Sequence, residues 1–432
     1  MSIIRDMTRK SAYPRFVRIH LLTLFGILGV IGVLNVLGDP FDYFRPQLDG
    51  TIDPYKKRSA TRYARANVVA NGEWDVIFCG ASRTEIGFDP EHPAFDGQKV
   101  YNFGLAGAKF TEIWFASKYA IECNPSLRTL FVEMHPSYFN YQPLSGRFLT
   151  SRFGPHPQPV NYGIGQLLGS LATERSVSAL SKWSQGKHSE VYTSLGLRVR
   201  AIRPPDAIPW DWFEAEMSTG RRQRAAQRMA HQAYLDDPNA PWLDLSTLDV
   251  FPQLLDLAQN QGTQIKVVIS PSHETWLAQL IDEGHYSQVN DLKRRFAKFV
   301  GEARPLADGR ASLVVYDFLV DDEFNAEPIP RVEGQDTRWH WEGGHFRVEL
   351  GNRMLELIAS DSEPATGTFG AQLTPETIDA HLVCVANDLA RRLPTIAIVN
   401  KHMDSEQIVH RLRTVTSRVA AIERANDGPT TR

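Results

Sequence analysis

The sequence predicts an α/β fold with a central parallel sheet, and three observations lead to this prediction. Short apolar segments with strand character alternate along the chain with segments of helical periodicity. The strands are apolar throughout, as they are when helices cover both faces of a parallel sheet. One long apolar run stands apart at the N-terminus. We therefore expect a three-layer sandwich preceded by one transmembrane helix.

The composition fits a folded protein and excludes some functions. The chain has 432 residues, of which 42% are hydrophobic and 22% are charged, enough for one large or two ordinary domains. A formal net charge of −3 argues against simple electrostatic binding of nucleic acid, so we expect no such partner. The three cysteines form neither a metal-ligand spacing nor a disulfide framework; they are Cys79, Cys123 and Cys384.

The N-terminus predicts a membrane anchor. Residues 1–18 carry five Lys and Arg side chains and precede the apolar stretch 19–38. A helix of about 20 residues is about 30 Å long, the thickness of the hydrocarbon core of a bilayer. Asp39, Pro40 and Asp42 then end the span. Because cationic residues favour the cytoplasmic side, we expect residues 1–18 in the cytoplasm and the rest of the chain outside it.

A cleaved signal peptide and a buried soluble helix are the alternatives to this anchor. The apolar core of a signal peptide has about 7–15 residues and precedes a cleavage site of small residues. The run in this chain is longer, and Val36, Leu37 and Gly38 make a poor cleavage site. We therefore favour an uncleaved single-pass anchor.

A linker over residues 39–72, which contains a short helix, leads into an α/β domain over residues 73–360. Strands are expected over residues 75–79, 100–103, 129–134, 263–269 and 311–318. Helices are expected over residues 110–123, 250–260, 274–303 and 351–359.

An insertion over residues 137–261 separates the third strand from the fourth, with helical character at residues 165–183 and 212–234. Large insertions in open α/β sheets often form a lid or a substrate wall, and a helical subdomain without a role in binding is the alternative.

A linker and a helical tail are expected over residues 361–432. This tail docks on a partner, pairs with itself or forms a solvated hairpin. The tail helices are expected over residues 375–392 and 405–424.

The turn after the first strand offers a nucleophile. Residues 76–90 (VIFCGASRTEIGFDP) run from a strand into a tight turn that exposes the Ser82 hydroxyl at the carboxyl edge of the sheet. Ligands of open α/β folds bind at this edge. A serine there is a nucleophile when a base lies within hydrogen-bond reach, and the alternative role of Ser82 is a helix N-cap.

A glutamate and a histidine near the last core helix offer the base. In residues 339–346 (WHWEGGHF), Glu342 lies three residues before His345, so its carboxylate can orient the imidazole and stabilise the charged form. A metal site is the alternative. We expect none, because a metal needs a third ligand and the two glycines between Glu342 and His345 indicate a loop.

A glycine-rich turn after the second strand offers an oxyanion hole. In residues 101–108 (YNFGLAGA), Gly104 and Gly107 allow backbone N–H groups to approach a developing oxyanion without an intervening side chain. The alternative is an ordinary turn between a strand and a helix.

Taken together, these segments resemble the SGNH (GDSL-like) hydrolase superfamily. They are more closely similar to its membrane-anchored branch, which includes the alginate O-acetylation proteins and the D-alanine transfer protein of lipoteichoic acid. Ser82 in CGASRT matches the nucleophile block of the family, and Gly107 in NFGLAGA matches its oxyanion glycine. Glu342 and His345 match its Asp-x-x-His block.

The likeness covers roughly residues 70–140 and 262–360 and departs from the family in two ways. The Gly-x-Asn-Asp block is absent, since the chain reads EMHPS after the third strand. Loss of the oxyanion donor in that block costs about 3 kcal/mol of transition-state stabilisation, unless His135 or Ser137 replaces it. Glutamate at position 342 is one methylene longer than the aspartate of the family.

The resemblance implies a serine esterase or O-acyltransferase, anchored in a bacterial inner membrane with its main domain in the periplasm. It would remove an acyl group from a cell-surface polysaccharide or transfer one to it, with acetyl as the first candidate. Ser82 would attack the ester, His345 would act as base and then acid, and Glu342 would orient His345. The N–H groups of Ser82 and Gly107 would hold the oxyanion, and no cofactor is needed.

Two alternatives stay open beside this function. The chain could be a non-catalytic envelope protein that keeps the fold as a polysaccharide-binding or assembly module, or a lipid esterase or thioesterase. Proteins of envelope biosynthesis are further candidate partners. Four residues are candidate substrate contacts: Arg83 for an anionic sugar, Trp341 for stacking on a sugar ring, and His135 and His273 at the sheet edge. For each of these four, a packing or capping role is the alternative.

Overall fold

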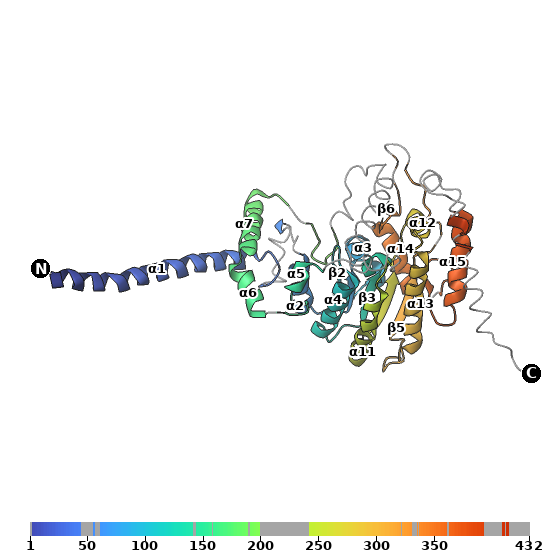
Figure 1. Cartoon of the computed structure of the whole chain (residues 1–432), viewed down its shortest axis with the longest axis horizontal. Helices are drawn as coiled ribbons and strands as arrows, with labels where there is room; N and C mark the ends of the chain where they lie inside the picture. Colours follow the sequence, from blue (N-terminus) through green and yellow to red (C-terminus); the bar gives the residue numbers. More distant parts are fainter. Residues whose placement is uncertain are drawn as a thin grey trace, which may run out of the picture. The chain divides into compact units, whose positions relative to one another are not determined.

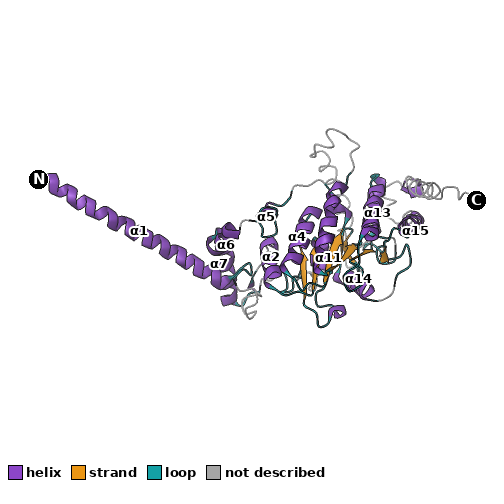
Figure 2. Ribbon diagram, turned by 90° about the horizontal axis from the view of Figure 1, so that it is seen from below, coloured by secondary structure: helices purple, strands orange, loops and turns teal. Residues whose placement is uncertain are grey.

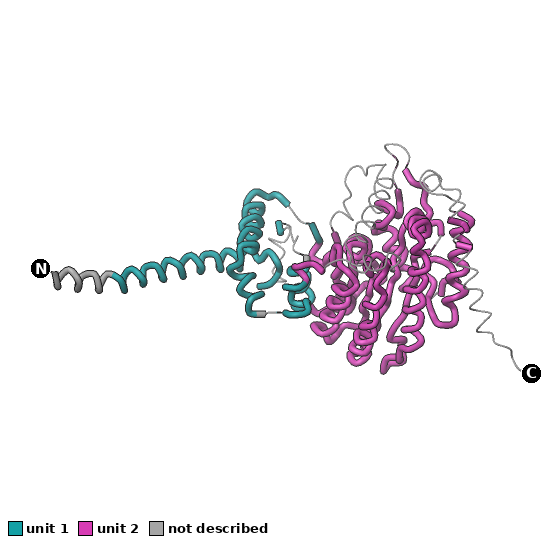
Figure 3. Tube along the Cα trace, in the orientation of Figure 1, with its two compact units in different colours: residues 1–71, 149–192 teal, residues 72–148, 193–432 magenta. Residues whose placement is uncertain are grey.

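The structure, a computed structural model, describes most of the chain as two compact units (Figure 3). Unit 1 comprises residues 1–71 and 149–192, and unit 2 comprises residues 72–148 and 193–432. The described residues are 2–44, 55–56, 61–140, 144–157, 159–188, 191–198, 242–320, 322–330, 335, 337–360, 363–392, 408–410 and 412–413.

Unit 2 is built on a six-stranded sheet with the order β2-β1-β3-β4-β5-β8. The first five strands are parallel and nearly all their residues are buried, as the apolar runs predict; β8 is an antiparallel edge strand. The strands are β1 (Val76–Gly80), β2 (Val100–Gly104), β3 (Thr129–Met134), β4 (Gln264–Ile269), β5 (Leu313–Asp317) and β8 (Ala371–Gln372). The mixed α/β class and the mostly parallel sheet are therefore confirmed.

Helices cover the sheet on both faces, with α4, α11 and α13 on one side and α14 on the other (Figure 2). Their bounds are α3 (Ser82–Gly87), α4 (Phe110–Cys123), α11 (Phe251–Gln261), α12 (Glu274–Asp282), α13 (Tyr286–Glu302), α14 (Val348–Ala359) and α15 (Ile378–Arg392). The helix expected over residues 274–303 is two helices, because Gly284 adopts a φ of +80° between α12 and α13.

Unit 2 also contains shorter elements. A ribbon of two antiparallel strands, β6 (His340–Glu342) and β7 (His345–Phe346), precedes α14. The 3-10 helices described in unit 2 are η2 (Pro93–Phe95), η3 (Pro136–Phe139) and η4 (Leu245–Val250). A one-turn helix α5 (Gly146–Leu149) spans the boundary at residues 148 and 149 between the two units.

The segment expected to be a separate tail begins inside unit 2. Strand β8 pairs with β5, and α15 packs on α13, so residues 371–392 belong to the sheet domain. The tail helix expected over residues 375–392 is present as α15, whereas the one expected over residues 405–424 lies largely outside the described residues.

Unit 1 contains the N-terminal apolar helix α1 (Ser2–Gly38), seen at one end of Figure 1. Its stretch Tyr13–Gly38 has a mean hydropathy of 2.3 and is long and apolar enough to cross a membrane. The described part of this unit also contains the helices α2 (Thr61–Asn71), α6 (Pro159–Leu168) and α7 (Ser170–Gln185).

The insertion is thus divided between the two units. Residues 149–192 group with α1, and α11 groups with the sheet. The helix expected over residues 165–183 is broken at Gly169, which has extended backbone angles and begins α7. The helix expected over residues 212–234 lies outside the described residues.

Candidate active site

Ser82 lies at the carboxyl edge of the sheet, as the first residue of α3 directly after β1. Its Oγ lies 2.8 Å from Nε2 of His345. The turn that carries it, residues 80–84 (the serine turn), requires a glycine at its start. A Cβ on Gly80 would lie 2.0 Å from Oγ1 of Thr84, which the fold does not allow.

His345 and Glu342 face each other across the ribbon β6–β7, where they are paired in register. Nδ1 of His345 is hydrogen-bonded to Oε1 of Glu342. With a carboxylate as its partner, Nδ1 donates, and Nε2 is left to accept the Ser82 hydroxyl hydrogen. The side chain of His345 is 32% exposed and that of Glu342 is 14% exposed. The structure thus brings the three residues together as a hydrogen-bonded hydroxyl, imidazole and carboxylate, open to solvent at the histidine.

A buried carboxylate fixes the serine turn from below. Glu133, near the end of β3, is fully buried and accepts hydrogen bonds from four groups. Its Oε2 accepts from the Ala81 N–H at 3.2 Å, from Thr84 Oγ1 at 3.3 Å and from the Tyr138 hydroxyl at 2.8 Å. Its Oε1 accepts from Ser270 Oγ at 2.6 Å. Since all of these donors belong to the elements around the site, Glu133 sets the position of the turn that carries the nucleophile.

The two glycines of the turn after β2 differ: Gly104 is buried and hydrogen-bonded within the fold, whereas Gly107 is exposed. The Gly104 N–H donates to Asn102 Oδ1 at 3.0 Å, and this residue is buried, so we remove Gly104 from the candidate oxyanion donors. Gly107 is exposed with a φ of +68°, and a Cβ built on it would meet no atom within 4 Å. Its N–H makes no hydrogen bond to any described residue. The N–H of Ser82, at the first position of a helix, has no partner within that helix.

Two side chains connect α3 to the glycine-rich turn. Oε1 of the buried Glu85 accepts from the Ala106 N–H at 2.9 Å, which fixes the residue before Gly107. Asn102 donates from Nδ2 to the carbonyls of Thr84 and Phe88 at 2.6 and 2.8 Å. The serine turn and the candidate oxyanion turn are therefore held as one assembly.

The ribbon that carries His345 is fixed in a similar way. Glu327 accepts hydrogen bonds from the N–H groups of Arg338, Trp339 and His340, at 2.6 to 3.1 Å. The ring of Phe346, next to His345, is fully buried and packs 5.9 Å from that of Phe88. This contact sets the distance between α3 and the ribbon.

Arg83 and His135 lie beneath the site instead of in an open groove. The side chain of Arg83 is 5% exposed, and its Nη1 donates to the Tyr138 hydroxyl at 3.4 Å. His135 is fully buried, with Nδ1 at 2.7 Å from Ser137 Oγ and Nε2 at 3.0 Å from Ser272 Oγ. Burial, and then the charges of Arg83 and His345, hold the pKa of His135 well below its usual value. Both side chains therefore hold neighbouring residues in place, and neither is exposed to a polysaccharide.

His273 and Trp341 are also buried, so the structure places neither where a substrate contact would be made. His273 caps α12: its Nδ1 accepts from the Thr275 N–H at 3.3 Å, and its Nε2 lies 2.9 Å from the Glu327 carbonyl oxygen. Burial lowers the pKa of His273 to about 3. Trp341 is 5% exposed, and the guanidinium carbon of Arg347 lies 4.5 Å from the centre of one of its rings. Its stacking face is therefore taken by this chain's own arginine.

Several residues at the site carry no local sequence signal. Glu133, Glu85 and Glu327 act through contacts with residues distant in sequence, which a motif does not reveal. Lys109, two residues after Gly107, has Nζ 2.7 Å from Asn140 Oδ1, and burial lowers its pKa to about 8. In the sequence, the position of Lys109 directly after the glycine-rich turn indicates a cation near the candidate oxyanion donors.

No group of three or more His, Cys, Asp and Glu side chains that could hold a metal ion occurs in the part of the chain that the structure describes. No model of a known protein family matches the chain, and no curated protein matches it.

Proposed function

We propose that this protein is a membrane-anchored serine esterase or O-acyltransferase of the SGNH type. One observation carries the proposal. Ser82 Oγ lies 2.8 Å from Nε2 of His345, and Nδ1 of the same imidazole is hydrogen-bonded to Glu342. This is the arrangement that nucleophilic acyl transfer requires, because it makes the serine oxygen reactive at neutral pH.

In the proposed reaction, Ser82 Oγ attacks the ester carbonyl while Nε2 of His345 takes the hydroxyl proton. Glu342 stabilises the imidazolium that results. The N–H groups of Ser82 and Gly107 donate to the oxyanion of the tetrahedral intermediate. Collapse of this intermediate breaks the ester bond, and His345 returns the proton to the leaving alcohol, which leaves an acyl group on Ser82.

The second half of the reaction decides between hydrolase and transferase. Water as acceptor releases the acid, and a sugar hydroxyl as acceptor forms a new ester, with His345 again taking the proton. We propose an acetylated or acetyl-accepting cell-surface polysaccharide as the substrate and the periplasmic side of a bacterial inner membrane as the location. The basic residues that precede the apolar stretch 19–38 and the partly exposed site support this proposal.

The first prediction tests the nucleophile. We expect Ser82→Ala in the detergent-solubilised full chain to lower the kcat for p-nitrophenyl acetate hydrolysis by about 10⁴-fold or more. A fluorophosphonate probe should label the wild-type chain at Ser82 and leave the variant unlabelled.

Ser360→Ala is the matched control, since Ser360 is the exposed C-cap residue of α14 and its hydroxyl donates to the Leu357 carbonyl instead of to His345. It should keep its kcat within about tenfold of the wild type. If the wild-type chain neither reacts with the probe nor turns over ester, the alternative of a non-catalytic binding module replaces this proposal.

A further inference from the structure

Unit 1 contains a pocket of about 490 Å³ that takes no part in the proposed reaction. This volume lies within the range of about 300–1,000 Å³ that is typical of small-molecule sites. Its walls come from the segment after α1, from α2, and from α6 and the start of α7. All of them belong to the same compact unit.

The pocket lies where the apolar helix leaves the proposed membrane. The last two turns of α1 are packed against α6 and α7: Nδ2 of Asn35 donates to the Leu167 carbonyl at 2.8 Å. A Cβ on Gly38 would lie 2.6 Å from Cβ of Ser176. Phe41, three residues beyond the end of α1, is a wall of the pocket. In Figure 1, α6 and α7 run across this end of α1.

The lining is amphiphilic, with rings and aliphatic side chains beside hydrogen-bonding groups. The hydroxyls of Tyr63 and Tyr162 are engaged, the first 2.7 Å from Thr150 Oγ1 and the second 3.1 Å from Asn67 Oδ1. Their rings therefore act as apolar walls, together with Phe41.

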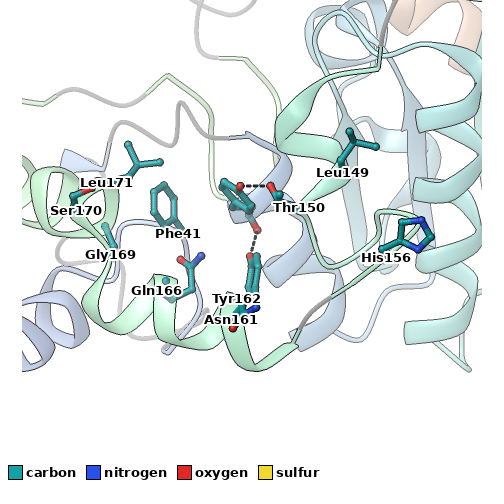
Figure 4. Close-up of a pocket in the computed structure, with 13 residues that line it drawn as sticks. Phe41, Leu149, Thr150, His156, Asn161, Tyr162, Gln166, Gly169, Ser170 and Leu171 are labelled. Atoms are coloured by element: carbon teal, nitrogen blue, oxygen red, sulfur yellow. Dashed lines mark hydrogen bonds between the residues drawn. The ribbon is translucent and has the colours of Figure 1, made fainter.

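Among the described residues, Gln166 is a buried polar side chain that lines the pocket. Gln166 is 7% exposed, and its amide makes no hydrogen bond with any described residue. Figure 4 shows the amide directed into the space between Phe41 and Tyr162. An amide that faces the pocket and has no partner in the described part of the chain can donate to or accept from a ligand bound there.

Apolar side chains lead from the pocket to the surface of the same helices. Val160 is 72% exposed and Ile164 is 54% exposed, both on α6, and Leu149 at the rim of the pocket is 43% exposed. Val160 and Ile164 are one turn apart and share a face of α6. Exposed apolar side chains beside a membrane span are typical of a segment that lies at the bilayer interface.

We propose that this pocket binds a phospholipid of the membrane, with the ester carbonyl at the Gln166 amide and the upper acyl chain along Phe41 and Leu149. The proposal rests on the proposed anchoring of the chain by α1. It commits to a lipid because the pocket adjoins the proposed membrane helix, its outer rim is apolar, and the buried Gln166 amide can donate to an ester carbonyl.

The experiment uses the full chain in nanodiscs that contain a phosphatidylcholine with a diazirine in its acyl chain. After illumination, lipid adducts are located by mass spectrometry. We expect adducts on residues 13–30 of α1 and on the pocket-lining residues 161–172. Gly165→Leu places an aliphatic side chain at the wall of the pocket, where a Cβ on this glycine meets no atom within 4 Å. It should lower the pocket adducts by about tenfold and leave those on α1 unchanged.

Gly146→Leu is the matched control, another helical glycine with open space around its Cβ but outside the pocket, and should leave both sets of adducts unchanged. Gln166→Ala provides a second variant that removes the amide without filling space, and it should also lower the pocket adducts.

The outcomes separate this inference from the anchoring on which it rests. Adducts on α1 without adducts in the pocket, or pocket adducts that survive Gly165→Leu, would overturn the lipid site alone. Absence of adducts on α1 would overturn both the anchor and the lipid site. Labelling of the pocket by a soluble photoreactive oligosaccharide, with none by the lipid, would assign the pocket to a sugar and also overturn the inference.

Discussion

Two of the acid–histidine pairs described in unit 2 lie at the carboxyl edge of the sheet and differ in their surroundings. In the first, His345 is 32% exposed and Glu342 is 14% exposed. In the second, His381 of α15 and Asp317 at the end of β5 are 1% and 0% exposed, with Nε2 and Oδ2 2.8 Å apart. The chemical components of the two pairs are nearly the same, so their environments must decide what each pair does.

Neighbouring residues of the fold hydrogen-bond to both members of the Asp317–His381 pair. Lys293 Nζ lies 2.6 Å from Asp317 Oδ2, and Nδ1 of His381 accepts the Gly367 N–H at 3.0 Å. Burial works to raise the pKa of Asp317, but the charge of Lys293 and the bond to His381 together outweigh it and lower this pKa. Both imidazole nitrogens are engaged within the fold, so the pair connects α13 and α15 to β5.

The Glu342 pair leaves one nitrogen for chemistry. Nδ1 of His345 is bonded to the acid, and Nε2 faces the Ser82 hydroxyl at an exposed edge. An acid–histidine pair can therefore serve as a base only where its outer nitrogen reaches a hydroxyl and a substrate can approach. This difference predicts that changes to the two acids have opposite consequences.

Of the changes to the two pairs, Glu342→Gln is expected to have the largest effect, because it replaces the carboxylate by an amide that can stabilise the wrong tautomer of His345. We expect the kcat for ester hydrolysis to fall by about 10³- to 10⁴-fold. The free energy of unfolding in urea should change by less than about 1 kcal/mol, because the pair is partly exposed. A variant with normal turnover would remove Glu342 from the mechanism.

Asp317→Asn should have the opposite profile. It leaves the Lys293 ammonium buried without its counter-charge, which costs about 3–5 kcal/mol of folding free energy. Turnover per folded molecule should stay within about threefold of the wild type, since β5, which ends at Asp317, lies three positions along the sheet from β1, which precedes Ser82.

The matched control for that variant is Asp379→Asn, because Asp379 pairs with Arg294 at 3.1 Å but is 37% exposed. Unfolding experiments should give a loss below about 1 kcal/mol for this partly exposed ion pair. Equal losses for the two aspartates would contradict the contrast between the buried and the exposed pair.

A smaller effect is expected for Glu85→Gln, which weakens the charge-assisted bond to the Ala106 N–H in the glycine-rich turn. If this bond positions the oxyanion donor at Gly107, the kcat should fall by about tenfold with little change in KM. A rise in KM at constant kcat would instead assign Glu85 to ground-state binding of the substrate.

The sequence was informative where function and fold depend on short contiguous patterns. The five parallel strands were predicted from apolar runs, and Ser82, Glu342 and His345 were singled out because each stands in a short motif after a strand or before a helix. Parallel strands end at one edge, so their turns converge.

Other features depend on contacts that no local pattern encodes. Glu133 fixes the Ala81 N–H from 52 residues away, and β8 has two residues, too few for a periodic signal. Arg83, His135, His273 and Trp341 were singled out by residue type, but their burial follows from tertiary packing. Similarly, no pattern predicts that α6 and α7 pack against the end of the apolar helix.

The smallest expected effect concerns His273, the buried histidine that caps α12. Its pKa of about 3 in the folded protein lies below the value of about 6.5 in an unfolded chain. As the pH falls below about 6.5, only the unfolded state takes up this proton, so stability is lost at low pH. Protonation of His273 in the unfolded state therefore lowers the free energy of unfolding by about 1.4 kcal/mol between pH 7.5 and pH 5.5.

The variant that tests this effect is His273→Asn, which keeps a capping side chain. We expect its free energy of unfolding, measured in urea at both pH values, to fall less steeply than that of the wild type. An unchanged difference between the two pH values would show that His273 is not held neutral in the fold.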